Sequence, residues 1–225
     1  MSLVLVIAAA TACGEQDAPT TSFTAATTAQ SAYQATSILV DETRGPNTVK
    51  VNLPQVMGGS PAVRDRFNSG MRTALDDLAG PAVDTTIDDG TLMGDERSGV
   101  TTLGPHVVGG VAIFNWYAKG AAHPNNSVAT IVIDAGTAKP VMLQDIWTDP
   151  QAAVVRLATV LPQIDDRVGA LEPGLDIFAN WVPTPDGFHV FVPVIHAMGD
   201  YLPVTVPWDK ISDLMTPQMR TALAG

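Results

Sequence analysis

The chain of 225 residues is poor in cysteine, in basic side chains and in aromatic ones. Its single cysteine excludes an intramolecular disulfide and a zinc site built from four thiolates. Lys and Arg number 12 against 23 Asp and Glu, which gives a net charge of −11. A protein that tracks nucleic-acid phosphates needs a basic face, so we expect no nucleic-acid partner.

Charged residues are scarce as well, at 16% of the chain, while hydrophobic residues make up 46%. This composition is too apolar for a disordered chain and predicts a folded core. The length allows one domain or two small ones. Because no internal repeat and no second low-complexity stretch divides the chain, one folded domain is the simpler interpretation.

The first 12 residues, MSLVLVIAAATA, carry no charge and stand directly before Cys13. This run is shorter than the roughly 20 residues that span a bilayer. An apolar run followed by small residues is typical of a secretory signal peptide, which we predict for residues 1–12. With Cys13 next, the segment resembles a bacterial lipoprotein signal, which implies that Cys13 is lipidated and is the protein's only attachment to the membrane. A plainly cleaved signal, and a buried first strand with an inert thiol, are the alternatives.

Residues 13–37 are rich in Thr, Ser and Ala and supply little to bury. We predict that they form a flexible polar tether, and that residues 38–225 form the folded domain. The expected location is outside the cytoplasm, on the outer face of the cell membrane or in the cell wall by the lipid anchor, or else secreted.

The clearest local pattern predicts one long amphipathic helix at about residues 61–79. Ser60 and Pro61 are a typical helix start, and Gly80 with Pro81 ends it. Apolar residues recur between them at spacings of three and four. They are Val63, Phe67, Met71, Leu75 and Leu78.

Alternating apolar residues predict a strand at 48–53, and further patterns predict six more strands and two later helices. Strands and helices do not alternate strictly. The expected fold class is therefore α+β, with a mixed, mainly antiparallel sheet on which the helices pack. The six strands are expected at 83–93, 97–103, 107–117, 128–134, 187–194 and 201–206, and the helices at 150–168 and 208–223.

Three segments together resemble one protein family. They are VKVNLPQVMGG (49–59) with Phe67-Asn68 after it, YAKGAAHP (117–124) with LQDIW (143–147) after it, and PDGFHVF (185–191). The chain resembles the extracytoplasmic domain of RsiV-type, lysozyme-sensing anti-sigma factors (DUF3298-like) and related secreted or lipid-anchored immunogenic proteins of actinobacterial cell walls. The resemblance covers residues from about 49 to 214, and it implies an α+β binding domain with lysozyme as a concrete partner.

The resemblance makes His123 the most prominent candidate. Small residues precede it and Pro124 follows it, which places the imidazole at a strand–loop junction where it can bind or titrate. The simpler interpretation, which we favour, is that it hydrogen-bonds a backbone carbonyl. Tyr117, Asn125 and Trp147 complete the set of candidate binding residues.

No sequence motif indicates catalysis or a metal. The chain has neither a G-x-S-x-G nor an S-x-x-K motif, although a trio assembled by the fold, such as Ser98, His123 and Asp134, stays open. The four histidines lie far apart, and no calcium-loop or H-E-x-x-H pattern occurs. We therefore predict no catalytic residue, no metal and no cofactor.

Together these observations favour a cell-envelope lipoprotein that acts as a non-catalytic binding domain. The acidic surface favours a basic partner such as lysozyme, or another envelope component. Two alternatives remain: an envelope esterase or other hydrolase centred on His123, and a carrier of an apolar ligand.

Overall fold

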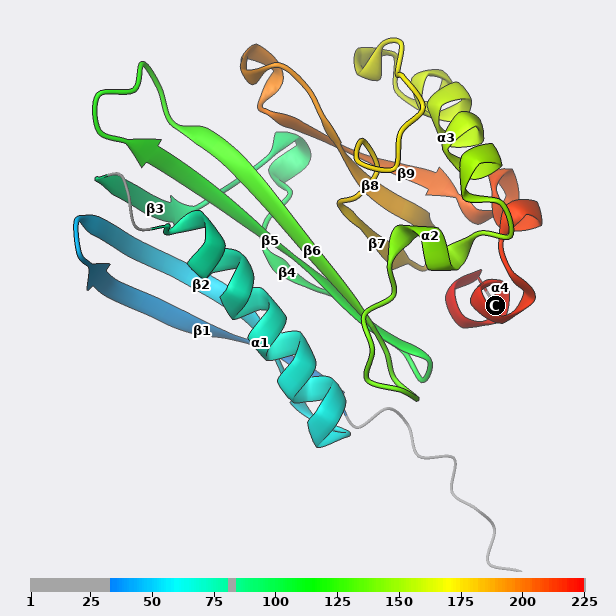
Figure 1. Ribbon diagram of the computed structural model, residues 1–225, viewed down its shortest axis with the longest axis horizontal. Coiled ribbons are helices and arrows are strands. Elements are labelled where there is room, and N and C mark those ends of the chain that lie inside the picture. The colour runs from blue at the N-terminus through cyan, green and yellow to red at the C-terminus, as the bar shows by residue number, and fades with distance from the viewer. Residues whose placement is uncertain (1–32, 81–83, 225) are drawn as a thin grey trace, which may run out of the picture.

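The computed structural model describes residues 33–80 and 84–224. The predicted signal peptide and Cys13 lie outside these residues. Six strands form the first sheet in the order β1, β2, β3, β5, β4, and β6 pairs with β5 on its other edge (Figure 1). The strands are β1 (Tyr33–Arg44), β2 (Asn47–Gly58), β3 (Thr85–Asp89), β4 (Gly99–Leu103), β5 (Val107–Ala118) and β6 (Asn125–Asp134).

All neighbours in the first sheet are antiparallel except β2 and β3, which run parallel. β3 and β4 follow one another along the same edge of β5, because β3 pairs with residues 114–118 and β4 with residues 108–111. β5 is therefore the strand on which this sheet is assembled.

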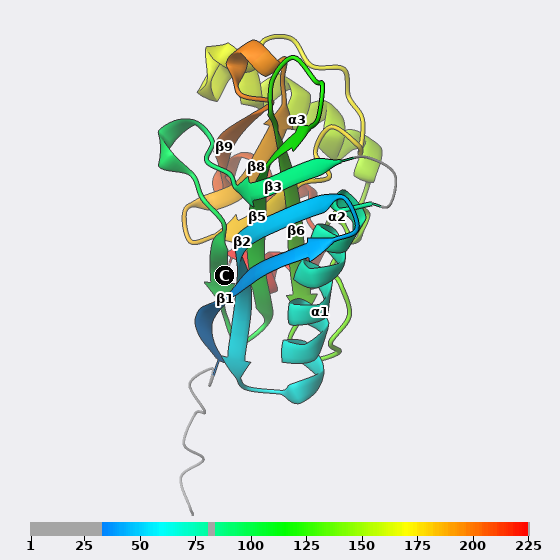
Figure 2. The same ribbon diagram turned by 90° about the vertical axis from the view of Figure 1, so that its left-hand side faces the viewer.

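A second, antiparallel sheet consists of β7 (Trp181–Thr184), β8 (Gly187–Pro193) and β9 (Tyr201–Pro207). β7 contacts β4, β5 and β6, and helix α3 (Pro150–Ile164) packs against β9 (Figures 1 and 2). The smaller helices α2 (Leu143–Ile146) and α4 (Pro217–Ala224) lie near this second sheet (Figure 1). Short 3-10 turns complete the elements, at Met93–Asp95 (η1), Asp166–Val168 (η2), His196–Met198 (η3), Trp208–Lys210 (η4) and Ser212–Leu214 (η5).

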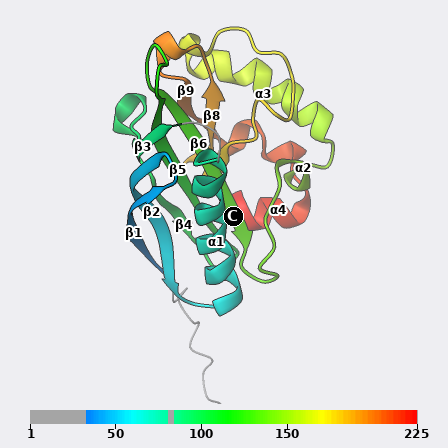
Figure 3. The ribbon, with the colours of Figure 1, turned by 60° about the vertical axis from the view of Figure 1, so that its left-hand side comes forward.

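Helix α1 (Pro61–Leu78) covers one face of the first sheet, lying over β2, β5 and β6 (Figure 3). Its apolar stripe, Val63, Phe67, Met71 and Leu75, is fully buried. The helix approaches β6 closely at Gly70, where a Cβ atom would stand 2.1 Å from Ile131 Cδ1. With Ile131 in this rotamer, the contact leaves no room for a Cβ atom at position 70.

β5 is buried on both faces and separates two hydrophobic cores. Val108, Ala112 and Phe114 belong to the core under α1, whereas Val111 and Ile113 belong to the core shared with the second sheet. This division follows the period of two along a strand.

A glycine in β5 makes room for the core under α1. The ring of Phe67 approaches Gly110 so closely that a Cβ there would lie 2.8 Å from Phe67 Cζ and 2.8 Å from Gly99 O. An aromatic residue on the helix and a glycine on the strand are therefore complementary in shape.

The register of the strands gives the molecule two ends. At one end β1 begins at Tyr33 opposite Gly58, the β4–β5 turn joins Leu103 to Val107, and β6 finishes at Asp134 opposite Val107. We call it the tether end. At the other end lie the turn between β1 and β2 and the hairpin between β5 and β6 (Figure 1).

The predicted α+β class with a mixed, mainly antiparallel arrangement is confirmed, and the strands divide into two sheets. The long helix has the predicted place at 61–78. The domain boundary at residue 38 was set too late, since residues 33–37 lie in β1. Their polar side chains gave no apolar signal, because β1 is an edge strand held by its pairing with β2.

Three predicted elements differ markedly in the structure. The helix expected over 208–223 is the shorter α4, preceded by the 3-10 turns η4 and η5. β3 spans five residues where a strand over 83–93 was expected, and α3 ends at Ile164, two residues after Pro162, where it was expected to reach 168. In the part of the chain that the structure describes, no helix combines the length and the apolar character needed to cross a membrane.

Candidate functional site

Three of the four candidate binding residues lie together at the β5–β6 hairpin. Tyr117, near the end of β5, is 39% exposed, His123 lies exposed in the loop, and Asn125 opens β6 opposite Trp116. The pairing of β5 with β6 brings the three close in space, as their proximity in the sequence suggested.

The loop is held on its β5 side by Asp84. Lys119 Nζ donates to Asp84 Oδ2 at 2.9 Å, and its backbone N–H donates to the Asp84 carbonyl at 2.8 Å. Gly120 has φ +91°, a backbone conformation that residues with a side chain rarely adopt. The turn therefore favours a glycine at this position of the YAKGAAHP segment.

His123 stacks on a second histidine from a distant part of the chain. Its ring centroid lies 3.6 Å from that of His196 in the β8–β9 connection, with the planes 8° apart. Figure 2 shows the hairpin and this connection side by side. His123 Nδ1 also lies 3.1 Å from the carbonyl oxygen of Pro124, the kind of backbone contact that the simpler interpretation proposed.

Asp200 links the two loops. Its Oδ1 lies 3.0 Å from Nδ1 of His196, and its Oδ2 accepts the backbone N–H of Asn126 at 2.7 Å. Asn126 Nδ2 in turn donates to the Gly199 carbonyl. Asp200 has φ +70°, an uncommon backbone conformation that these contacts hold in place.

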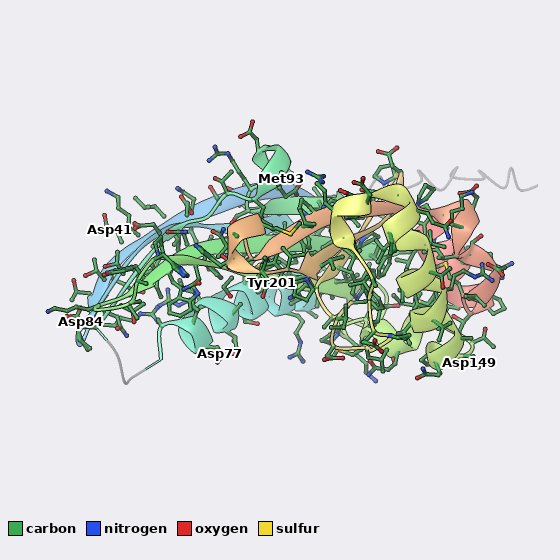
Figure 4. The ribbon with its side chains drawn as sticks, turned by 90° about the horizontal axis from the view of Figure 1, so that it is seen from above. Asp41, Asp77, Asp84, Met93, Asp149 and Tyr201 are labelled. Atoms are coloured by element: carbon green, nitrogen blue, oxygen red, sulfur yellow. The ribbon has the colours of Figure 1, made fainter. Side chains whose placement is uncertain are left out.

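The next residue, Tyr201, is half-buried, and burial raises the pKa of its hydroxyl, with the Asp200 carboxylate adding to the effect. We call this surface, residues 117–126 with residues 195–201, the hairpin end. Figure 4 shows Tyr201 seen from above, with Asp84 at one extremity of the molecule.

The structure separates Trp147 from the other candidates. Its side chain is 3% exposed and packs in the core beside Phe188, with ring centroids 5.9 Å apart. Leu143 and Ile146 of α2 are buried with it, and its backbone bridges to Met215. Trp147 is therefore a packing residue in this structure and does not lie with the other candidates.

The trio of Ser98, His123 and Asp134 is not assembled. Asp134 stands at the tether end of β6, nine residues after Asn125, so it lies about 30 Å along the strand from the hairpin end. Ser98 Oγ exchanges hydrogen bonds with the backbone of Ile113 at 2.8 and 3.1 Å.

At the hairpin end, Asp200 and His196 form a carboxylate–imidazole pair, and the ring of His123 stacks on that of His196. Within the described residues, no hydroxyl group hydrogen-bonds to either ring, and no cluster of three or more His, Cys, Asp or Glu could hold a metal ion. The arrangement suits recognition through exposed aromatic and imidazole faces and a carboxylate.

Comparison with known proteins shows which solved structures share this fold. No protein-family model and no curated protein matches the sequence. A solved structure of a DUF3298 family member from Bacteroides fragilis NCTC 9343 matches with a TM-score of 0.60 and 17% identity, over 86% of this chain and 98% of that one. A DUF3298 family protein from Pseudomonas aeruginosa PAO1 matches with a TM-score of 0.54 and 12% identity, over 83% and 94%.

The chain has a DUF3298-like fold. This confirms the fold that the sequence resemblance implied. At these identities the DUF3298-like match concerns architecture, so the RsiV-type and actinobacterial features of the resemblance stay predictions.

Sequence reasoning missed the partners from the β8–β9 connection in this DUF3298-like domain. His196 and Asp200 lie more than 70 residues after His123, in the connection between two strands of the other sheet. The spacing of four between them was the available signal, because it allows a carboxylate to reach the imidazole across one short turn.

Proposed function

We propose that this protein is an exported, non-catalytic binding domain of the cell envelope, tethered through lipid on Cys13, which meets a basic protein with its hairpin end. The proposal rests mainly on where the two ends lie. The described chain begins with Tyr33 at the tether end, while the hairpin end lies at the opposite side of the β5–β6 ladder. A domain held at the tether end would turn its hairpin end away from the membrane.

The length of the predicted tether fits this arrangement. Between Cys13 and Tyr33 stand 19 residues. A flexible segment of that length has a typical end-to-end distance of about 25 Å. Such a tether would keep the domain near the membrane and leave the hairpin end free to meet proteins outside the cell.

Charge supports a basic partner. The described residues carry all 12 Lys and Arg and 21 of the 23 Asp and Glu, a net charge of −9. Acidic side chains are spread widely over the surface, as the labelled Asp41, Asp77, Asp84 and Asp149 illustrate (Figure 4). A field of this sign speeds the approach of cationic proteins at low salt. Lysozyme is the concrete candidate.

The anchor is tested by metabolic labelling with a fatty-acid analogue in a bacterial host. We expect label on the wild-type protein and none on Cys13→Ala. Equal labelling of both proteins would refute the lipid anchor and would leave the binding proposal to be judged separately.

The binding surface is tested by retention on immobilised lysozyme across a salt gradient. We expect retention that weakens as salt rises, because exposed charges are screened within about 10 Å at 0.1 M salt. His123→Ala should elute earlier than wild type. His106→Ala is the matched control, since it removes another exposed histidine, from the tether end. If the two variants elute at the same salt concentration, the hairpin end is not the binding surface. If the wild-type protein is not retained at all, lysozyme is not the partner.

Hydrolysis is the second candidate, because the His196–Asp200 pair has the carboxylate–imidazole geometry found in hydrolytic triads. Turnover of short acyl esters by the purified chain would support it. That activity must vanish in both His123→Ala and His196→Ala and persist in His106→Ala.

A further inference from the structure

A groove at the tether end is separate from the surface described above. It lies between the β4–β5 turn, the β7–β8 turn and helix α4, and encloses about 600 Å³. That volume falls within the range of small-molecule sites, roughly 300 to 1,000 Å³. Leu103, Val107 and Leu223 give it a mainly apolar lining, with Pro183 and Pro185 on the β7–β8 side. Four threonines also line it: Thr101, Thr102, Thr184 and Thr221.

A second recess of about 560 Å³ continues from the first, and four residues line both. Its other lining residues are mainly polar, with Asp134, Thr137 and Gln218 among them. The residues common to the two recesses are Pro105, His106, Thr221 and Ala222. An apolar chamber thus opens into a polar one at the turn of α4 that carries Thr221 and Ala222.

The polar recess contains hydrogen-bonding groups that are not used within the described fold. Asp134 Oδ1 accepts from the backbone of Gly136 and from both the backbone and the hydroxyl of Thr137, whereas its Oδ2 makes no hydrogen bond with the described residues. The His106 ring and the Gln218 amide make none there either. Acceptors and donors therefore stand together beside an apolar chamber.

Charge restricts what can fill the polar recess. Among the described residues that line the two recesses, Asp134 is the single carboxylate, and none is Lys or Arg. An anionic head group would meet the Asp134 carboxylate without a cation to offset it. A head group with hydroxyls would find the Asp134 Oδ2 acceptor and the polar groups of His106 and Gln218.

We infer that this double recess binds a single-chain amphiphile, with its acyl chain in the apolar chamber and an uncharged, hydroxyl-bearing head group in the polar one. The inference does not depend on the lipid anchor or on the basic partner. It assigns the tether end a ligand site of its own.

The test uses 1-monolauroylglycerol, with dodecanoate and glycerol as comparison ligands, in titration calorimetry. The full chain carries Cys13→Ala throughout, so that no covalent lipid competes. We expect saturable binding of 1-monolauroylglycerol, binding of dodecanoate weaker by about tenfold, and none of glycerol. Equal affinity for dodecanoate, or no binding of 1-monolauroylglycerol, would overturn the inference.

Three variants locate the site. Ala222→Trp fills the junction of the two recesses and should weaken binding by about tenfold or more. Thr221→Trp should do the same from an exposed position that poses little risk to folding. Ala170→Trp, on an exposed loop residue that lines neither recess, is the matched control and should bind normally.

A fourth variant tests the head-group argument. Asp134→Asn keeps an oxygen to accept the turn's hydrogen bonds and removes the charge, so it should bring the affinity for dodecanoate closer to that for 1-monolauroylglycerol. Undiminished binding in both Ala222→Trp and Thr221→Trp would show that the ligand binds elsewhere, and an unchanged preference in Asp134→Asn would refute the charge argument.

Discussion

Replacing Asn47 with alanine should strongly destabilise the fold. Asn47 is 1% exposed at the start of β2. Its Nδ2 donates to the carbonyl oxygens of Ala79 and Gly80, which follow α1, at 2.9 Å each, and its Oδ1 accepts the backbone N–H of Thr85 at 3.1 Å. One amide thus joins β2, the end of α1 and the beginning of β3.

The expected loss follows from these three bonds. A buried polar group that loses its partner costs about 1 to 3 kcal/mol. Ala79 and Thr85 are buried, and the Gly80 carbonyl is better placed to find water. We therefore expect Asn47→Ala to lower the free energy of unfolding by about 2 to 4 kcal/mol. Asn47→Asp should cost at least as much, because its carboxylate would face two carbonyl oxygens.

Urea unfolding followed by circular dichroism measures the effect. With a denaturant slope of about 2 to 3 kcal/mol per molar, a loss of 3 kcal/mol moves the midpoint by about 1 to 1.5 M. Asn52→Ala is the control, because it removes the same side chain from an exposed site on the same strand, where the amide bonds Asp89. The reasoning fails if the two alanine variants unfold within about 0.5 kcal/mol of each other.

Three further predictions concern pH and glycine. Burial lowers the pKa of His189 below its ordinary 6.5, so the unfolded state binds the proton more readily than the folded state. The folded state should therefore lose stability as pH falls below 6.5, by at most about 1.4 kcal/mol per pH unit. Thermal unfolding at pH 7.5 and 5.5 should show a smaller loss in His189→Gln. Gly110→Ala should cost about 1 to 3 kcal/mol in urea unfolding, because its Cβ meets both the Phe67 ring and the Gly99 carbonyl oxygen; a loss below about 0.5 kcal/mol would contradict the steric reasoning. Gly120→Ala should cost about 1 kcal/mol through its positive φ alone, and no change in melting temperature would contradict that.

Local patterns in the sequence predicted elements that bury regularly spaced apolar side chains. The stripe of Val63, Phe67 and Met71 fixed α1 to within a residue at its end, since only one face of that helix meets the sheet. No local pattern predicted the strand β1. An edge strand is held by its backbone pairing, and in β1 residues such as Ile38 and Leu39 stay exposed. Division of the strands into two sheets depends on pairings between distant residues, which no local pattern contains.

The candidate site followed the same rule. Tyr117, His123 and Asn125 are neighbours in one hairpin, so sequence proximity placed them together. His196 and Asp200 reach them through the packing of one sheet against the other. Trp147 lies in the core, because an aromatic residue near an element's end can serve packing as readily as binding.

The position of β5 has a consequence for how the protein unfolds. Because its alternate side chains enter both cores and its two edges carry β3, β4 and β6, neither half of the molecule keeps a complete core once β5 detaches. Both cores should therefore melt in one cooperative transition, with no half surviving as an independent folding unit. Loss of strand pairing at either end of the domain should therefore destabilise the other end as well, because β5 runs through both.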